Sequence, residues 1–195
     1  MMDVLISIQP YWCYLIASGC KTVEIRKNHP RLKPPFRCYI YMTAAQRLGR
    51  LWEYDTAYKN TSGRVLNGSQ KVIGEFICDR ITDLGNISTD PWRYLLGNIH
   101  EDHKRLVTEE ACLTEEVLLK YGGRYAWHIS NLVIYDQPKD LSEFWQAGNG
   151  VEEYCIACPH HEVDVVEEPC KNCDGNRKYL YRPPQSWCYV VGPAA

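Results

Sequence analysis

The sequence has no apolar run approaching the roughly 20 residues of a membrane-spanning helix. Its first residues carry no basic stretch ahead of a long apolar core, so they indicate a first strand rather than a signal peptide. No internal repeat or low-complexity tract is present. Without an export signal we expect a cytoplasmic protein, whose ten cysteines are thiols or metal ligands rather than disulfides.

The chain also has little net charge, −2 over 195 residues. This excludes a protein that coats nucleic acid through bulk positive charge. The charges are nevertheless segregated, because residues 21–37 contain six basic residues and one acidic residue, whereas residues 141–169 contain no lysine or arginine. A local basic surface therefore remains available to a phosphate-bearing ligand.

Hydrophobic periodicity predicts more strands than helices. The expected strands are residues 4–8, 22–27, 38–43, 71–82, 125–135 and 186–191. Helices are expected from Pro10 to Gly19, within the polar stretch 44–70, and over 90–121. Gly74 permits a bulge or a close backbone approach. This order predicts an α+β, mainly β fold, a small barrel with helices at its ends, because only the first helix separates early strands.

Two C-x-x-C pairs lie late in the chain, separated by eleven residues. Two thiolates at this spacing can face one cation, and two such pairs complete a tetrahedral zinc site. The expected ligands are Cys155, Cys158, Cys170 and Cys173. Because four thiolates leave no open position, we expect this zinc to be structural. Two redox or chance pairs, or a site in which His160 or His161 replaces a cysteine, are the alternatives.

Residues 19–26 read G-C-K-T-V-E-I-R and combine a turn with a short alternating strand. In a strand, Val23 and Ile25 can point inward while Thr22, Glu24 and Arg26 share the other face. Together with a lysine at the turn, these groups could grip a polar ligand or form an acid–base pair. The plainer alternative is an exposed strand with a surface ion pair.

Three segments together resemble the ASCH domain of the PUA-like superfamily. They are I-S-I-x-P at residues 6–10, the signature G-x-K-x-x-E-x-R at 19–26, and V-I-G-E-F at 72–76. Residues 138–144 and 182–187 look like the closing part of bacterial and phage members.

The resemblance covers most of residues 3–145 and 182–191. It implies a PUA-like β-barrel domain formed by residues 1–145 and 182–195, with a cleft beside the signature. Residues 150–181 would then be an inserted zinc knuckle or ribbon.

The ASCH family is linked to RNA binding, and some members hydrolyse an acylated cytidine or cleave RNA. Enzymatic members similar to this chain use a lysine in the signature, a nearby threonine and a glutamate on a later strand. Lys21 matches that lysine, and Glu75 is the candidate for the later glutamate. Glu24 stands where some hydrolases have threonine, although Thr22 lies close by.

The first hypothesis is a binding module for RNA or a nucleotide. Lys21 and Arg26 would hold phosphate, Glu24 would accept from a base amino group, and an aromatic ring would stack on a base. The expected ligand-binding residues are Lys21, Thr22, Glu24, Arg26, Lys27, Tyr125 and Trp127. Aromatic side chains in an alternating strand nevertheless belong to a core more often than to a stacking platform.

The second hypothesis is a small hydrolase acting on a modified nucleoside, such as N4-acetylcytidine, or on RNA. Its catalytic residues would be Lys21, Glu24 and Glu75, with burial lowering the pKa of the lysine. The third is an adaptor that binds a protein partner through the acidic zinc segment. We expect His128 to be structural and the six remaining cysteines to be buried thiols.

Overall fold

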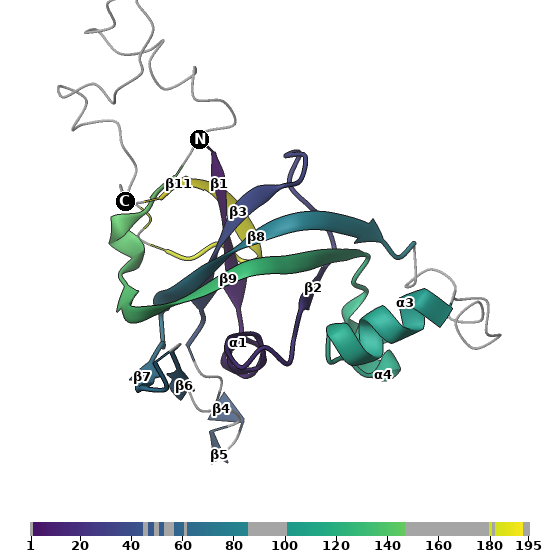
Figure 1. Ribbon diagram of the computed structural model, residues 1–195, viewed down its shortest axis with the longest axis horizontal. Coiled ribbons are helices and arrows are strands. Elements are labelled where there is room, and N and C mark those ends of the chain that lie inside the picture. Colours follow the sequence, from purple (N-terminus) through teal and green to yellow (C-terminus); the bar gives the residue numbers. More distant parts are fainter. Residues whose placement is uncertain are drawn as a thin grey trace, which may run out of the picture.

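The computed structural model describes residues 2–44, 47–48, 51–52, 57–60, 62–85, 101–146, 180 and 182–192. Within them, one mixed sheet of seven strands dominates, and the helices lie at its margins (Figure 1). None of the described helices is long and apolar enough to cross a membrane.

The described strands and helices follow one another in the order below. They are β1 (Asp3–Ile8), α1 (Pro10–Ala17), β2 (Val23–Arg26), β3 (Phe36–Met42), β4 (Arg47–Leu48), β5 (Leu51–Trp52), β6 (Ala57–Lys59), β7 (Val65–Asn67), β8 (Lys71–Asp83), the helix α3 (Glu101–Arg105), the π-helical turn η1 (Leu106–Glu110), α4 (Glu115–Tyr121), β9 (Tyr125–Lys139), the 3-10 turn η2 (Leu141–Glu143), β10 (Trp145–Gln146) and β11 (Trp187–Val191).

The seven-stranded sheet has the order β10-β11-β1-β3-β8-β9-β2 and is strongly curled. The β1–β3 pair is parallel, and the other neighbouring strands are antiparallel. In a flat sheet, four strand spacings would hold β1 and β2 about 19 Å apart. Instead, the Arg26 side chain of β2 donates a hydrogen bond to the Ser7 carbonyl of β1 over 2.7 Å. The sheet therefore curls into a barrel-like body, with β2 near β1.

The inside of this curled sheet holds the main core. Alternate side chains of β1, β3, β8 and β9 point inward and pack with α1, and Ile6, Ile40, Phe76 and Trp127 are among those fully buried. On the other face of β2, Val23 and Ile25 pack against η1 and α4. A third cluster covers the outer face of β1 and β3. Because β2 is covered on both faces, all four of its residues are buried.

Local sequence explains several of these elements. Pro10 occupies the first turn of α1, where its missing N–H costs no hydrogen bond. The Thr114 side chain accepts from the Val117 N–H and so caps α4. A β-carbon at Gly74 would lie 2.3 Å from the Val133 carbonyl oxygen, and the β3–β8 and β8–β9 registers both shift nearby. Gly74 therefore allows the close strand approach that the sequence predicts.

The prediction of an α+β, mainly β fold with flanking helices is confirmed. Within residues 44–70, however, the described parts contain the β4–β5 and β6–β7 hairpins and no helix. Residues 90–100 of the predicted helical stretch and the whole segment 150–179 lie outside the described residues.

Candidate functional site

The signature begins with a turn that places Lys21 next to the end of α1. Gly19 has φ +75°, a left-handed conformation that costs glycine little. The Lys21 N–H then donates to the Leu15 carbonyl, and the Thr22 N–H donates to the Glu110 carbonyl, both over 2.9 Å. The turn is thus held between α1 and the end of η1.

The Lys21 side chain is enclosed, with 2% of its surface exposed. Its ammonium donates to the Ala111 carbonyl over 2.6 Å and lies 3.4 Å from a Glu24 carboxylate oxygen. The same Nζ lies 5.0 Å from the centre of the Trp12 ring, a cation–π distance. These three contacts surround the ammonium inside the protein.

Glu24 connects Lys21 to Arg26, and both partners of the carboxylate are buried. Arg26 Nε lies 3.1 Å from Glu24 Oε1, close enough for an ion pair but without the alignment of a hydrogen bond. The two terminal nitrogens of Arg26 donate to the Ser7 carbonyl over 2.7 Å and to the Ser186 hydroxyl over 3.4 Å. We call Lys21, Glu24 and Arg26 the buried cluster.

Burial also shifts the pKa of groups in and beside the buried cluster. It lowers the pKa of Lys21, while the nearby Glu24 carboxylate acts in the opposite direction. Burial likewise raises the pKa of the Cys13 thiol well above its ordinary value, with Glu24 adding to the effect. The cluster thus links β2 to β1 and to Ala111.

Glu75 lies on the opposite face of the sheet from the buried cluster. It pairs in register with Tyr39, whose ring belongs to the outer core. Its carboxylate accepts from the Tyr135 hydroxyl and lies 3.4 Å from Arg37. Burial, and then Glu75, raise the pKa of Tyr135. The structure therefore brings Lys21, Glu24 and Arg26 together but does not bring Glu75 to them.

The two proposed stacking residues differ in exposure. Trp127 is fully buried and packs edge-on against Phe36, with ring centres 5.9 Å apart, so neither face is open to a base. Tyr125 is half-buried at the start of β9. Its ring contacts the His29 ring at 4.5 Å and the Arg124 guanidinium at 5.1 Å.

The connection between β2 and β3 is held by two hydrogen bonds to β11. Trp187 donates to the Asn28 side chain over 2.9 Å, and the Arg31 N–H donates to the Tyr189 hydroxyl over 2.8 Å. Pro30 is buried and Leu32 packs on the core, whereas Arg31 and Lys33 are exposed. The connection therefore presents its cations to solvent from an anchored backbone.

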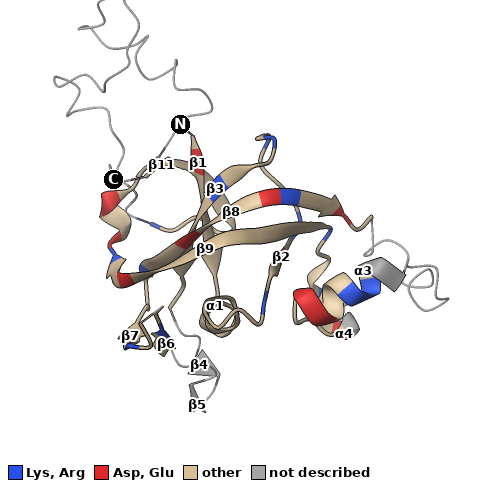
Figure 2. Ribbon diagram, in the orientation of Figure 1, with Lys and Arg blue, Asp and Glu red and all other residues tan. Residues whose placement is uncertain are grey.

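Basic and aromatic residues lie along the β2–β3 connection, where Figure 2 shows more than one basic segment. The Lys27 ammonium lies 5.2 Å from the centre of the Tyr121 ring, and residue Tyr121 is 37% exposed. We call Lys27, Arg31, Lys33, Tyr121 and Tyr125 the loop surface. Among the described residues, its three cations have no ion-pair partner.

Sequence reasoning singled out Lys27 and Tyr125 but missed Arg31, Lys33 and Tyr121 as site residues. The signal for two of them was present: Pro30 and Leu32 alternate with Arg31 and Lys33. Such alternation places the apolar pair inward and the cations outward.

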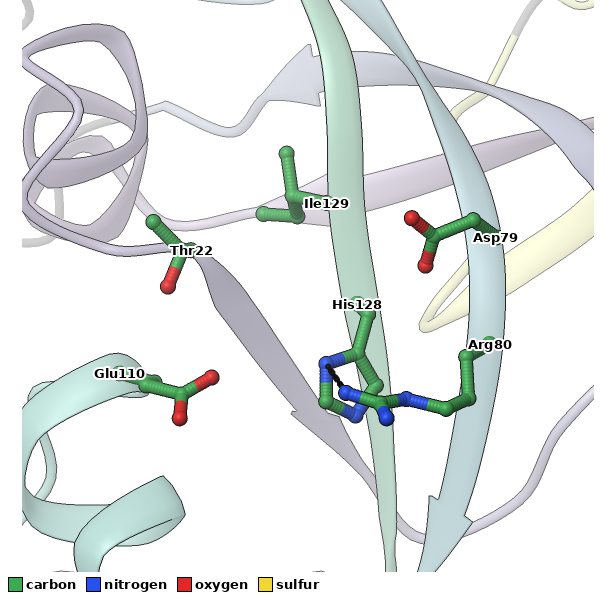
Figure 3. A pocket seen from close by; sticks show the side chains of 6 residues that line it. All are labelled: Thr22, Asp79, Arg80, Glu110, His128 and Ile129. Atoms are coloured by element: carbon green, nitrogen blue, oxygen red, sulfur yellow. Dashed lines mark hydrogen bonds between the residues drawn. The ribbon is translucent and has the colours of Figure 1, made fainter.

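An open pocket of about 460 Å³ lies at the other end of β2 (Figure 3). Thr22, Glu110 of η1 and the β8 residues Asp79 and Arg80 surround it, with Ile129 and His128 of β9 between them. No hydrogen bond or ion pair joins the Asp79 or Glu110 carboxylate to the described residues. Thr22 thus faces a pocket distinct from the loop surface.

His128 is held at both ring nitrogens. A guanidinium can only donate, so the Arg80 contact of 3.1 Å makes Nδ1 the acceptor and places the proton on Nε2. Nε2 then donates to the Thr82 hydroxyl over 2.9 Å. Burial, and then the Arg80 charge, lower the pKa of His128. These contacts fit the structural histidine that the sequence predicts.

The cysteines differ in exposure. Cys13, Cys38 and Cys78 are buried, as expected, whereas Cys112 and Cys188 are only partly covered. The prediction is wrong for Cys20, which is exposed at the signature turn. The four proposed zinc ligands, Cys155, Cys158, Cys170 and Cys173, lie outside the described residues, so that site stays a prediction. Within the described residues, no group of three or more His, Cys, Asp or Glu side chains is arranged to hold a metal ion.

No known family model matches the chain, and no curated protein sequence matches it. Among solved structures, it is similar to the ASCH protein of Zymomonas mobilis, with 20% identity over 71% of this chain and 73% of that one, and a TM-score of 0.42. A serine-to-alanine variant of that protein matches at 19% identity over 97% and 88% of the two chains, with a TM-score of 0.48. These values are too low to establish a shared family or activity.

Proposed function

We propose that this protein binds single-stranded RNA or a nucleotide through the loop surface. Lys27, Arg31 and Lys33 would contact phosphate oxygens, and the exposed Tyr121 ring would stack on a base. The resemblance of the signature to the ASCH domain, a family linked to RNA binding, supports the same ligand class. In this proposal, the buried cluster fixes β2 and so positions the loop that follows it.

One observation carries the proposal: an anchored loop presents three cations that have no ion-pair partner among the described residues, and one of them, Lys27, lies beside the Tyr121 ring. An anchored loop loses little conformational entropy when it binds, so its cations favour ligand binding more than cations on a freely moving segment would. Phosphate attraction is sequence-independent, and stacking tolerates every base. The proposal therefore predicts RNA affinity with weak sequence preference.

The test is a fluorescence anisotropy titration of a short labelled single-stranded RNA of mixed sequence. Replacing Lys27, Arg31 and Lys33 by glutamine should weaken binding by roughly 10- to 100-fold at about 0.15 M salt, because three phosphate contacts are lost. All three side chains are exposed, so the fold should survive.

The matched control replaces three other exposed basic residues, Lys59, Arg64 and Lys104, by glutamine. Lys59 and Arg64 belong to the β6–β7 hairpin and Lys104 to α3, away from the β2–β3 connection (Figure 1). This variant has the same net charge as the first but should bind RNA almost as the unsubstituted protein does. Equal weakening by both variants, or no weakening by either, would reject the loop surface as the binding site.

A hydrolase is the second candidate, favoured by the lowered pKa of the buried Lys21. That reaction would require Lys21 to leave the Ala111 carbonyl and meet a substrate. Incubation with N4-acetylcytidine or short RNA, followed by chromatography, tests it directly. Product formation that Lys21→Met abolishes in a folded protein would replace the binding proposal with a catalytic one.

A further inference from the structure

The signature turn lies against the end of η1 along three consecutive residues. The Thr22 N–H donates to the Glu110 carbonyl over 2.9 Å, and the Lys21 ammonium donates to the Ala111 carbonyl over 2.6 Å. Next in each segment, the Cys112 thiol contacts the Cys20 carbonyl at 3.3 Å. The two segments are therefore in contact, with the Cys112 side chain against the backbone of Cys20.

A disulfide typically spans Cα distances of about 4.4–6.8 Å. The Cys112 sulfur already lies 3.3 Å from the Cys20 carbonyl oxygen, so the two residues are neighbours and rotation of their side chains can bring the sulfurs together. The geometry of the backbone is thus compatible with a bond between the two sulfurs.

Both thiols are also accessible. Cys20 is exposed and Cys112 partly exposed, whereas Cys13, Cys38 and Cys78 are buried. Cys112 has φ +54°, an uncommon conformation for a residue other than glycine, and it directs this side chain back to the signature turn. Accessible, neighbouring thiols differ from the buried ones because an oxidant in solution can reach them.

We propose that Cys20 and Cys112 form a redox-sensitive pair, oxidised to a disulfide by small-molecule disulfides such as oxidised glutathione. The Cys20 thiolate attacks one glutathione sulfur, forms a mixed disulfide and releases the first glutathione thiolate. The Cys112 thiolate then attacks the Cys20 sulfur and releases the second. Two protein thiols are oxidised, one glutathione disulfide is reduced, and the two protons end on the released glutathiones.

The bond would close the long chain segment between residues that are 92 positions apart. It would fasten the signature turn before β2 to the segment that leads into α4, next to the Lys21–Ala111 hydrogen bond. A loop of this length restricts the unfolded chain strongly, so oxidation should raise the melting temperature by about 10 °C. The same bond would hold Ala111 in place as the acceptor of Lys21.

The experiment incubates the full chain in glutathione buffers of increasing oxidised fraction, blocks free thiols with iodoacetamide, and maps tryptic peptides without reduction. Trypsin releases Cys112 in the peptide 106–120 and Cys20 in the peptide 1–21. We expect these two peptides to become linked, with loss of two hydrogens, together with the rise in melting temperature. Fragmentation distinguishes Cys20 from Cys13, which shares its peptide.

Cys20→Ser and Cys112→Ser should each abolish both the link and the temperature shift. Cys188→Ser, a partly covered cysteine on β11, is the matched control and should keep both. The proposal is overturned if the two peptides stay unlinked in fully oxidised glutathione. Linkage through Cys13, or stable glutathione adducts on both cysteines without a link, would overturn it as well.

Discussion

The basic residues between positions 21 and 33 divide between two environments that differ sharply. In the buried cluster, Lys21 and Arg26 are 2% and 6% exposed, and their charges are matched by Glu24 and by backbone carbonyls. On the loop surface, the cations that follow are exposed and have no acidic partner among the described residues. The first set connects strands and the second is available to a ligand, although both belong to one run in the sequence.

This difference shows that burial, and not position in the sequence, determines whether a charged side chain is paired inside the protein or exposed to solvent. β2 is buried on both faces, so any charge on it must be paired inside the protein. One residue later the chain leaves the sheet, and Lys27 meets solvent and the Tyr121 ring. Substitutions on the two sides of this boundary should therefore change different properties, stability on one side and binding on the other.

The largest effect is expected from Glu24→Gln. This change leaves two buried cations without their shared carboxylate, and breaking a buried ion pair from one side costs about 3–5 kcal/mol. Urea unfolding measures the loss. Glu75→Gln is the control, because its partner Arg37 is 45% exposed, so water screens this pair and its loss should cost only about 0–1 kcal/mol. Equal losses in the two variants would contradict the comparison.

A smaller loss is expected from Lys21→Met. Methionine fills a similar space, and Glu24 keeps Arg26, but the Ala111 carbonyl loses its donor. An unsatisfied buried acceptor costs about 1–3 kcal/mol, so the variant should fold and be less stable. Denaturant unfolding at matched salt gives the value. A variant more stable than the unsubstituted protein would show that the ammonium destabilises the fold.

The third effect concerns the titration of His128, which pairs in register with Val23 of β2. Its pKa in the folded protein is lowered from 6.5, so between that lowered value and 6.5 the unfolded chain binds more protons. The free energy of unfolding must then fall as the pH is lowered through 6.5. This acid loss should be the smallest of the three effects, and unfolding at about pH 7.5 and about pH 5 measures it.

Arg80→Gln removes a cation that disfavours the imidazolium. The pKa of His128 should rise in this variant, which an NMR titration of the ring can follow. The acid loss of stability should shrink in parallel. A pKa that stays constant or falls would mean that Arg80 does not control the charge of this histidine.

The sequence predicts the elements better than it predicts the site. Periodicity and turn residues indicate β1, α1, β2 and the close approach at Gly74, because these depend on neighbouring residues. The burial of Lys21 and Arg26 depends on acceptors that are distant along the chain, the Ala111 and Ser7 carbonyls. Nothing within residues 19–26 encodes that contact.

The placement of Glu75 was beyond prediction for a related reason. A bulge beside Gly74 shifts the register of β8, and one such shift decides which face of the sheet a side chain occupies. The resemblance of the segment 72–76 to the ASCH domain suggested a role beside Lys21. In the folded chain, Glu75 instead meets Arg37 and Tyr135.

The salt dependence of RNA binding tests the central claim most directly. Kd is measured over a series of salt concentrations for the unsubstituted protein and for the variant with glutamine at Lys27, Arg31 and Lys33. If these cations contact phosphates, the slope of log K against log salt should lose about 2 of its magnitude, close to 0.7 for each single-strand contact. An unchanged slope, in a variant of unchanged stability, would contradict the division between the buried cluster and the loop surface.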